Sequence, residues 1–256
     1  MMDDNNQQQF LANLRAALGH PAAVRRRQKQ VCERPDDADR QALVKAISRR
    51  SPEQTQDLLD RLMAEGHLLN LQVISCPNCT AAGQAIAALL SDDISAGGSK
   101  RTIACWQHPL VTELDLVSHL GIRNISIYCV EQTMHPLRSA ERETIRRRVA
   151  ASFAGITSAD YCLADTASLV LRGRPGQDLC VALLPAIHIA VIRRKQLLAD
   201  MQELHALLQT NSPDCRDELP NRMTMISGPS KTGDIEATMV YGVHGPRNVY
   251  LLVIDT

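Results

Sequence analysis

Short apolar segments alternate with longer amphipathic ones along most of this 256-residue chain. The apolar or β-branched runs predict strands, which stand at about 69–75, 102–106, 125–130, 168–171, 180–184, 187–192, 223–226 and 249–254. Apolar residues spaced three and four apart predict helices at about 110–120 and 197–208, and a charged helix is expected at 139–151. This alternation predicts an α/β fold with a mainly parallel sheet flanked by helices.

One further helix has clear start and stop signals. Ser51 can cap it, Pro52 suits its first position, and Gln54 can complete a capping box. Its buried stripe would be Leu58, Leu59, Leu62 and Met63. Gly66 is expected to end this helix.

The first 37 residues differ from the rest of the chain. Residues 10–18 have the apolar spacing of a helix that ends at Gly19, and residues 19–37 combine prolines with a basic cluster and no periodicity. We therefore expect an N-terminal helical arm and basic tether over 1–37, followed by an α/β domain over 38–256.

Composition excludes several function classes. Lys and Arg number 28, and Asp and Glu also number 28, so the chain lacks the basic surplus of a nucleic-acid-binding protein. With two Phe, one Trp and four Tyr, it lacks the aromatic faces of a single-strand-binding platform. No apolar run approaches the roughly 20 residues of a membrane span, and the first ten residues, MMDDNNQQQF, do not read as a secretory signal. These features predict a cytoplasmic protein.

The segment after the strand at 223–226 carries most of the candidate chemistry. Its loop combines glycines, hydroxyls and one cation, in the residues Ser227, Gly228, Ser230, Lys231, Thr232 and Gly233. Asp234 is placed to cap a short helix, whose N-terminus would attract an anion to the loop. The loop is not a Walker A motif, because Lys231 follows Ser230 rather than a glycine. We therefore predict a crevice for an anion or a small carboxylate.

Other polar residues could complete this crevice. Glu236, in the first turn of the expected helix, could act as a base or nucleophile, and His244 is a residue type suited to proton transfer. Gly245 belongs to a second tight loop, and Thr166 and Ser168 lie at a turn that enters a strand. His108, which also follows a strand, could line the same crevice. Each of these residues also has a plain structural reading as a cap, a surface charge or a turn residue.

Residues 225–254, MISGPSKTGDIEATMVYGVHGPRNVYLLVI, resemble the signature of the lactate-utilization protein C (LutC) family of the LUD-domain superfamily. A second block supports the resemblance at 155–160, 164–171 and 184–195. In this block Asp165 stands where the family usually has Glu, and Ala167 where it usually has Gly. The resemblance is strong over about 150–256, weak over 38–149 and absent before.

The resemblance implies a Rossmann-like fold similar to that of the NagB/RpiA/CoA-transferase-like superfamily. It also implies a place in a cytoplasmic three-protein system that oxidises L-lactate to pyruvate. Two partner subunits of that system carry iron–sulfur clusters, whereas this component typically carries none. The chain would then be a non-catalytic or substrate-handling subunit.

The eight cysteines leave further alternatives. Cys76 and Cys79 form the sole CxxC, after a predicted strand and before a helical run, as in a redox motif. A zinc site needs four ligands, usually in two close pairs, and no second pair is present. We therefore predict no metal site and expect most cysteines to be reduced core residues.

Three hypotheses follow from these observations. The first is a subunit of a lactate-oxidising complex. The second is an independent transferase or isomerase that uses Glu236, and the third is a metal or redox protein built on Cys76 and Cys79.

Overall fold

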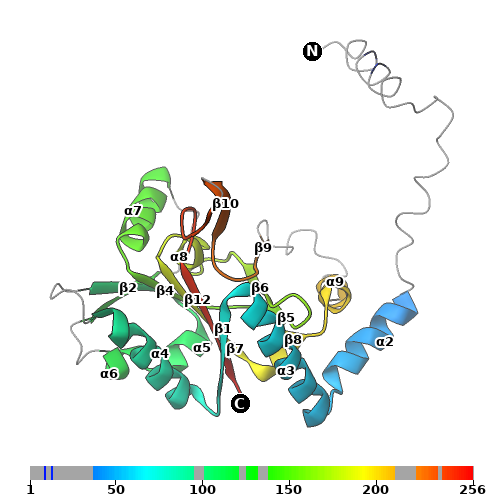
Figure 1. Cartoon of the computed structure of the whole chain (residues 1–256). Coiled ribbons are helices and arrows are strands. Elements are labelled where there is room, and N and C mark those ends of the chain that lie inside the picture. Colours follow the sequence, from blue (N-terminus) through cyan, green and yellow to red (C-terminus); the bar gives the residue numbers. More distant parts are fainter. Residues whose placement is uncertain are drawn as a thin grey trace. The chain divides into compact units, whose positions relative to one another are not determined.

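The computed structural model of the chain describes residues 9, 13, 37–94, 101–120, 125–131, 138–210, 223–235 and 238–255 (Figure 1). The chain divides into two compact units, Met1–Ala42 and Leu43–Thr256. The sheets, core and sites described below belong to the second unit. No helix among the described residues is long and apolar enough to cross a membrane.

A six-stranded sheet is the centre of the second unit. Its strands are β1 (Leu71–Cys76), β2 (Arg101–Trp106), β3 (Ile125–Val130), β4 (Ala154–Ser158), β7 (Ile187–Arg193) and β12 (Asn248–Ile254). Their spatial order is β1-β12-β7-β4-β2-β3, and every neighbouring pair is parallel. The predicted α/β fold with a parallel sheet is therefore confirmed.

The remaining described strands form a smaller four-stranded sheet and a separate hairpin. The smaller sheet has the order β8-β5-β6-β9, formed by β5 (Tyr161–Leu163), β6 (Ser168–Arg172), β8 (Leu197–Leu198) and β9 (Met223–Ile226). β6 pairs antiparallel with both β5 and β9. β10 (Lys231–Ile235) and β11 (Thr238–Tyr241) form a separate antiparallel hairpin.

Helices cover both faces of the parallel sheet (Figure 1). They are α3 (Pro52–Leu69), α4 (Cys79–Ile94), α5 (Pro109–Glu113), α6 (Leu116–Leu120), α7 (Ser139–Ala150) and α8 (Cys180–Leu183). α9 (Met201–Thr210) packs against the smaller sheet instead, and the other described helices are α2 (Asp37–Ser48) and the 3₁₀ helix η2 (Arg194–Gln196). Alternate residues of each strand enter different core clusters. Ile189 and Val191 pack with α4, α5 and α6, whereas Ala190 and Ile192 pack with α3, α7, α8 and β6.

The start of α3 is as predicted, and its end is not. Ser51 accepts a hydrogen bond from the Gln54 amide, and the Gln54 side chain accepts one from the Ser51 amide. The helix continues past Gly66 to Leu69. Asn70, rather than Gly66, ends it by adopting the left-handed conformation (φ 61°).

Two apolar runs form other elements than expected. Residues 180–184 are not a strand, since α8 occupies 180–183 and the Asp178 carboxylate accepts a hydrogen bond from the Cys180 amide at 2.9 Å. Leu197 and Leu198 form β8 rather than the start of a helix. α9 begins only after Asp200, whose carboxylate accepts hydrogen bonds from the amides of the first helical turn.

The helix predicted after Asp234 is also wrong, because β10 and β11 occupy this stretch as a hairpin. Strands β4 and β5 were not predicted. The helix expected over 10–18 and the tether expected over 19–37 lie almost entirely outside the described residues.

Candidate functional site

The C-terminal candidate segment lies at the amino ends of the parallel strands. The Arg247 and Asn248 amides both donate to the Ala186 carbonyl, directly before β7 begins. A Cβ on Gly228 would lie 2.7 Å from the carbonyl oxygen of Leu69, just before β1. The loop therefore follows β9 of the smaller sheet, and it does not occupy the carboxyl-end crevice that is typical of ligand sites in parallel sheets.

A chain of hydroxyl groups joins three of the predicted residues. The Ser168 and Ser227 hydroxyls lie 2.6 Å apart, and Ser168 also donates to the Thr166 hydroxyl at 2.9 Å. The Thr166 hydroxyl in turn donates to the Asp165 carboxylate at 3.2 Å. Antiparallel pairing of Leu169 with Ile226 places these loops side by side. Thr166, Ser168 and Ser227 thus belong to one polar cluster.

The turn that holds this cluster needs an unusual backbone conformation. Ala167 is fully buried and has a φ of 44°, in the left-handed region that favours glycine. The glycine that is usual in the resembling family would occupy this position without strain. Ala167 therefore adopts in this turn a backbone conformation that a glycine adopts more readily.

Backbone hydrogen bonds join the two loops of the C-terminal segment. The Ser230 amide donates to the Pro246 carbonyl at 2.9 Å, and the Gly242 amide donates to the Ser230 carbonyl at 3.0 Å. Gly228 has a φ of 85°, and a Cβ on Gly245 would lie 3.2 Å from the Cβ of Ser230. Gly245 therefore lets the two loops approach each other closely, whereas Gly228 lets its loop pass close to Leu69. Both predicted ligand residues thus have a structural role.

The remaining predicted residues lie on or beside the hairpin. Lys231 and Thr232 pair with Tyr241 and Val240, and Gly233 follows them along β10. Asp234 lies within β10 and so caps no helix. Glu236 lies outside the described residues.

Cationic side chains remain available at the hairpin end. Lys231 is exposed on β10, and Arg247 is exposed in the loop before β12. The imidazole of His244 is exposed in the same loop. Without a helix N-terminus, any attraction for an anion here rests on these side chains and on the neighbouring hydroxyls. The described part of this segment thus offers exposed cations and no helix N-terminus.

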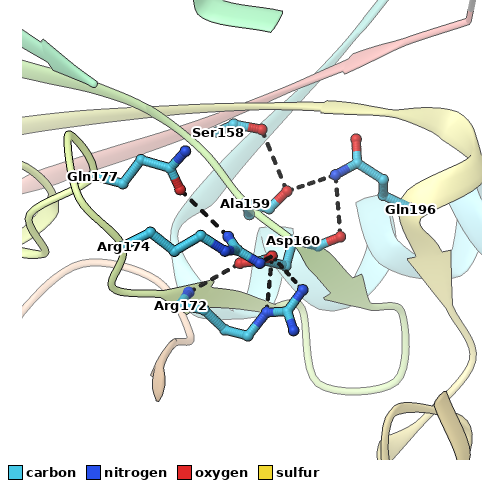
Figure 2. Close-up of polar contacts among 7 residues, drawn as sticks. All are labelled: Ser158, Ala159, Asp160, Arg172, Arg174, Gln177 and Gln196. Atoms are coloured by element: carbon cyan, nitrogen blue, oxygen red, sulfur yellow. Dashed lines mark hydrogen bonds and ion pairs between the residues drawn. The ribbon is translucent and has the colours of Figure 1, made fainter. Parts of the chain in front are cut away.

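A second polar cluster lies at the opposite edge of the sheet, where β4 ends (Figure 2). The Asp160 carboxylate accepts hydrogen bonds from the Arg172 amide at 2.9 Å, from Arg172 Nε at 2.9 Å and from Arg174 Nη2 at 2.6 Å. Gln196 donates to the carbonyls of Ala159 and Asp160. β4 and β2 are neighbours in the sheet, but the next parallel strand after β2 is β3 on one side, whereas the next after β4 is β7 on the other. The carboxyl ends of β4 and β2 are therefore a topological switch point.

The charges of this cluster offset the cost of burying Asp160. Burial raises the pKa of Asp160, but hydrogen bonds and charge from Arg174 and Arg172 outweigh it, so that the net pKa is lowered. Burial lowers the pKa of His108, whose Nδ1 accepts a hydrogen bond from the Leu110 amide. His108 therefore caps α5 at the carboxyl end of β2 and does not line the C-terminal loops, contrary to expectation.

The sequence analysis missed this cluster because it missed β4. An Asp that directly follows a buried strand is a recognisable signal, but Ala154–Ser158 was not identified as a strand. Arg172 and Arg174 carry no signal of their own, since only the smaller sheet brings them to Asp160.

The CxxC cysteines lie at the end of β1 and the start of α4. The Cys79 thiol donates to Glu113 Oε2 at 3.4 Å, and Arg193 donates to the same oxygen at 2.5 Å. Burial raises the pKa of Cys76, and burial together with Glu113 raises that of Cys79. Both groups are therefore held as thiols, unlike the activated thiolate of a redox motif. Within the described ranges, no three His, Cys, Asp or Glu residues are placed to hold a metal ion.

The model of the LUD domain family matches residues 52–254, which span both polar clusters and all of the parallel sheet. The chain belongs to the LUD domain family. The resemblance of the C-terminal signature is thereby confirmed, and its LUD domain begins at the first residue of α3.

Three similar relatives of this LUD domain protein are named lactate utilization protein C. The lactate utilization protein C of Halalkalibacterium halodurans is 32% identical over 165 residues, which cover 64% of this chain and 67% of the relative. That of Shouchella clausii is 31% identical, with coverage of 65% and 67%. That of an Exiguobacterium species is 38% identical, with coverage of 46% and 51%.

A solved structure shares the fold. The crystal structure of a DUF162 family protein from Deinococcus radiodurans superposes with a TM-score of 0.50 and 18% sequence identity. The match covers 78% of this chain and 98% of that one. At this identity the similarity shows the architecture alone.

Proposed function

We propose that this LUD domain protein takes part in L-lactate utilization, as a component of a cytoplasmic system that oxidises lactate to pyruvate. One observation carries the proposal: the LUD domain spans 52–254, and relatives at 31–32% identity over about two thirds of their length are named lactate utilization protein C. We place the iron–sulfur clusters in two partner subunits, and assign this chain no redox cofactor of its own.

Within this system the chain acts as a substrate-handling or scaffold subunit. Support comes from the exposed cations Lys231 and Arg247, which belong to the same C-terminal segment as Ser227, whose hydroxyl contacts that of Ser168. A small carboxylate such as lactate or pyruvate has one negative charge and hydrogen-bonding oxygens, and these side chains complement both features.

A deletion strain tests the role in lactate utilization. The strain is expected to lose growth on L-lactate while it grows normally on pyruvate, and the wild-type chain should restore growth. Lys231→Ala should restore it poorly, whereas Lys45→Ala, which removes an exposed cation from α2, should restore it fully. Normal growth of the deletion strain on L-lactate, in the absence of a second copy, would contradict the proposal.

Anaerobic purification tests the partners. A tagged chain should retain two iron–sulfur subunits, and the complex should oxidise L-lactate only when this chain is present. The variant Glu236→Gln separates handling from catalysis. If the isolated chain turns over a substrate and Glu236→Gln abolishes that turnover, an independent transferase or isomerase replaces the proposal.

A further inference from the structure

Two cysteines face each other on neighbouring strands of the parallel sheet. In the register of β2 and β3, Cys105 is the direct partner of Cys129. Neighbouring strands lie about 4.8 Å apart, which falls within the roughly 4.4–6.8 Å between Cα atoms that a disulfide requires. Both cysteines are free thiols in this structure.

The two thiols point to the same face of the sheet. Ile103 and Cys105 belong to the core cluster that packs with α4, α5 and α6, and Ile127 packs against that cluster from β3. Cys129 is two residues beyond Ile127 and therefore shares its face. Cys105 is 1% exposed, whereas Cys129 is exposed on the edge strand of the sheet. One thiol is thus exposed to solvent, and the other lies beside it on the neighbouring strand, buried.

Their contact favours reactivity at Cys129. A hydrogen bond from Cys105 lowers the pKa of Cys129, and the same contact, together with burial, raises that of Cys105. The other described cysteines have raised pKa values, namely Cys76, Cys79, Cys162 and Cys180. Thiolates react with oxidants faster than thiols, so the exposed member of the pair is the better nucleophile.

We propose that Cys105 and Cys129 form an oxidation site, in which a hydroperoxide converts the facing thiols to a reversible disulfide between β2 and β3. The site is independent of the lactate-utilization proposal, because it rests on strand register and not on the candidate anion site.

The proposed reaction balances without another cofactor. The Cys129 thiolate attacks the peroxide oxygen, which breaks the O–O bond and gives a sulfenic acid with loss of water or an alcohol. The Cys105 sulfur then attacks the Cys129 sulfur, forming the S–S bond and releasing water. The two thiols together lose two electrons and two protons to the peroxide, and a dithiol reductant reverses the reaction by exchange.

Tryptic peptide mapping tests the proposal on the full chain. Cleavage after Arg101, Arg123 and Arg138 places the two cysteines in separate peptides, 102–123 and 124–138, each with a single cysteine. After brief treatment with equimolar hydrogen peroxide and alkylation of free thiols, mass spectrometry should find these peptides linked and lighter by two hydrogen atoms. Dithiothreitol should separate them. In untreated protein, Cys129 should react with iodoacetamide at least tenfold faster than Cys79.

Variants define the outcomes. In Cys105→Ala, Cys129 should stop at a sulfenic acid that dimedone labels, whereas in Cys129→Ser, the buried Cys105 should stay reduced. Cys79→Ser is the matched control and should leave the linked peptide unchanged. Sulfinic or sulfonic acid at Cys129 of the wild-type protein without linked peptides, or linkage of either peptide to another cysteine instead, would overturn the proposal.

Discussion

His188 is a fully buried histidine in the parallel sheet, as its apolar sequence surroundings suggest. One ring nitrogen, Nε2, lies 2.9 Å from the Thr157 hydroxyl, and Nδ1 has no partner among the described residues. Burial lowers the pKa of this imidazole to about 3. His188 is therefore neutral in the folded protein at every pH at which the protein is expected to function.

This depressed pKa makes stability depend on pH. Below the ordinary histidine value of about 6.5, the unfolded chain takes up a proton at His188 that the folded chain excludes, so stability falls as the pH falls towards 3. Between pH 7 and pH 5 this histidine should cost about 2 kcal/mol of the free energy of unfolding. In urea unfolding, the free energy of unfolding of His188→Gln should fall between pH 7 and pH 5 by about 2 kcal/mol less than that of the wild type. The exposed-site variant His244→Gln is the control, and equal pH dependence in wild type and His188→Gln would refute the assignment.

Asp160 is the central residue of the second polar cluster, where β4 ends. Asp160→Asn should lower the free energy of unfolding by about 2 kcal/mol at pH 7, because Arg172 and the partly exposed Arg174 lose their shared counter-charge. Since the pKa of Asp160 is lowered by folding, its contribution is present above about pH 4 and is lost as the pH falls through the folded value. The difference between variant and wild type should therefore shrink in acid.

Glu143→Gln provides the control for Asp160→Asn. Glu143 pairs with Arg147 at 3.9 Å on the exposed face of α7, and such surface pairs contribute about 0.5 kcal/mol or less. Denaturant unfolding of both variants at pH 7 and pH 3 measures the comparison. A cost for Asp160→Asn no larger than that of Glu143→Gln would mean that the ion-pair cluster does not stabilise the fold.

At the scale of elements, the packing of α8 on β4 depends on a single glycine. A Cβ on Gly155 would lie 1.9 Å from the backbone oxygen of Val181 in α8, far inside any allowed contact. Gly155→Ala should therefore cost about 3 kcal/mol or more, since backbone must move to admit the methyl group. Gly233→Ala is the matched control, because nothing lies within 4 Å of its added Cβ. Thermal unfolding compares them, and equal midpoints would show that α8 is not held this closely.

Elements whose sequence carries a specific local signal were predictable, and elements whose sequence suits both a helix and a strand were not. The capping box of Ser51 and Gln54 fixes the start of α3 from within four residues. By contrast, the four apolar residues of α8 suit a strand or a helix equally. The hydrogen bond from the Cys180 amide to the Asp178 carboxylate favours the helical start. The C-terminal hairpin was mistaken for a helix because Asp234 and the apolar spacing after it satisfy helix signals too.

At the scale of the whole molecule, the LUD domain is the part of the chain whose stability can be predicted from the structure. Among the described residues, the buried apolar side chains lie between Leu59 and Ile254, and the family match spans residues 52–254. A chain that starts at Asp37 should therefore keep its cooperative unfolding transition, with a midpoint within about 2 °C of the full-length protein. Differential scanning calorimetry measures both chains. A midpoint several degrees lower would show that the first 36 residues stabilise the LUD domain.

The structure brings three of the predicted site residues together, in a location that the sequence did not indicate. Thr166, Ser168 and Ser227 were selected from sequence, and the structure joins them through hydroxyl contacts. Their position at the amino edge of the sheet could not be foreseen, because β9 belongs to the smaller sheet and not to the parallel one. Sequence order alone does not say which sheet a strand joins.

The sequence by itself determined the α/β class, the parallel sheet and the family. Alternating apolar runs, caps and the C-terminal signature are local patterns, and each is complete within a few tens of residues. Only the tertiary structure decided that Asp160 meets Arg172 and Arg174, and that Cys105 lies beside Cys129. These contacts join segments that strand order and register bring together, and that arrangement is set by the packing of the whole domain.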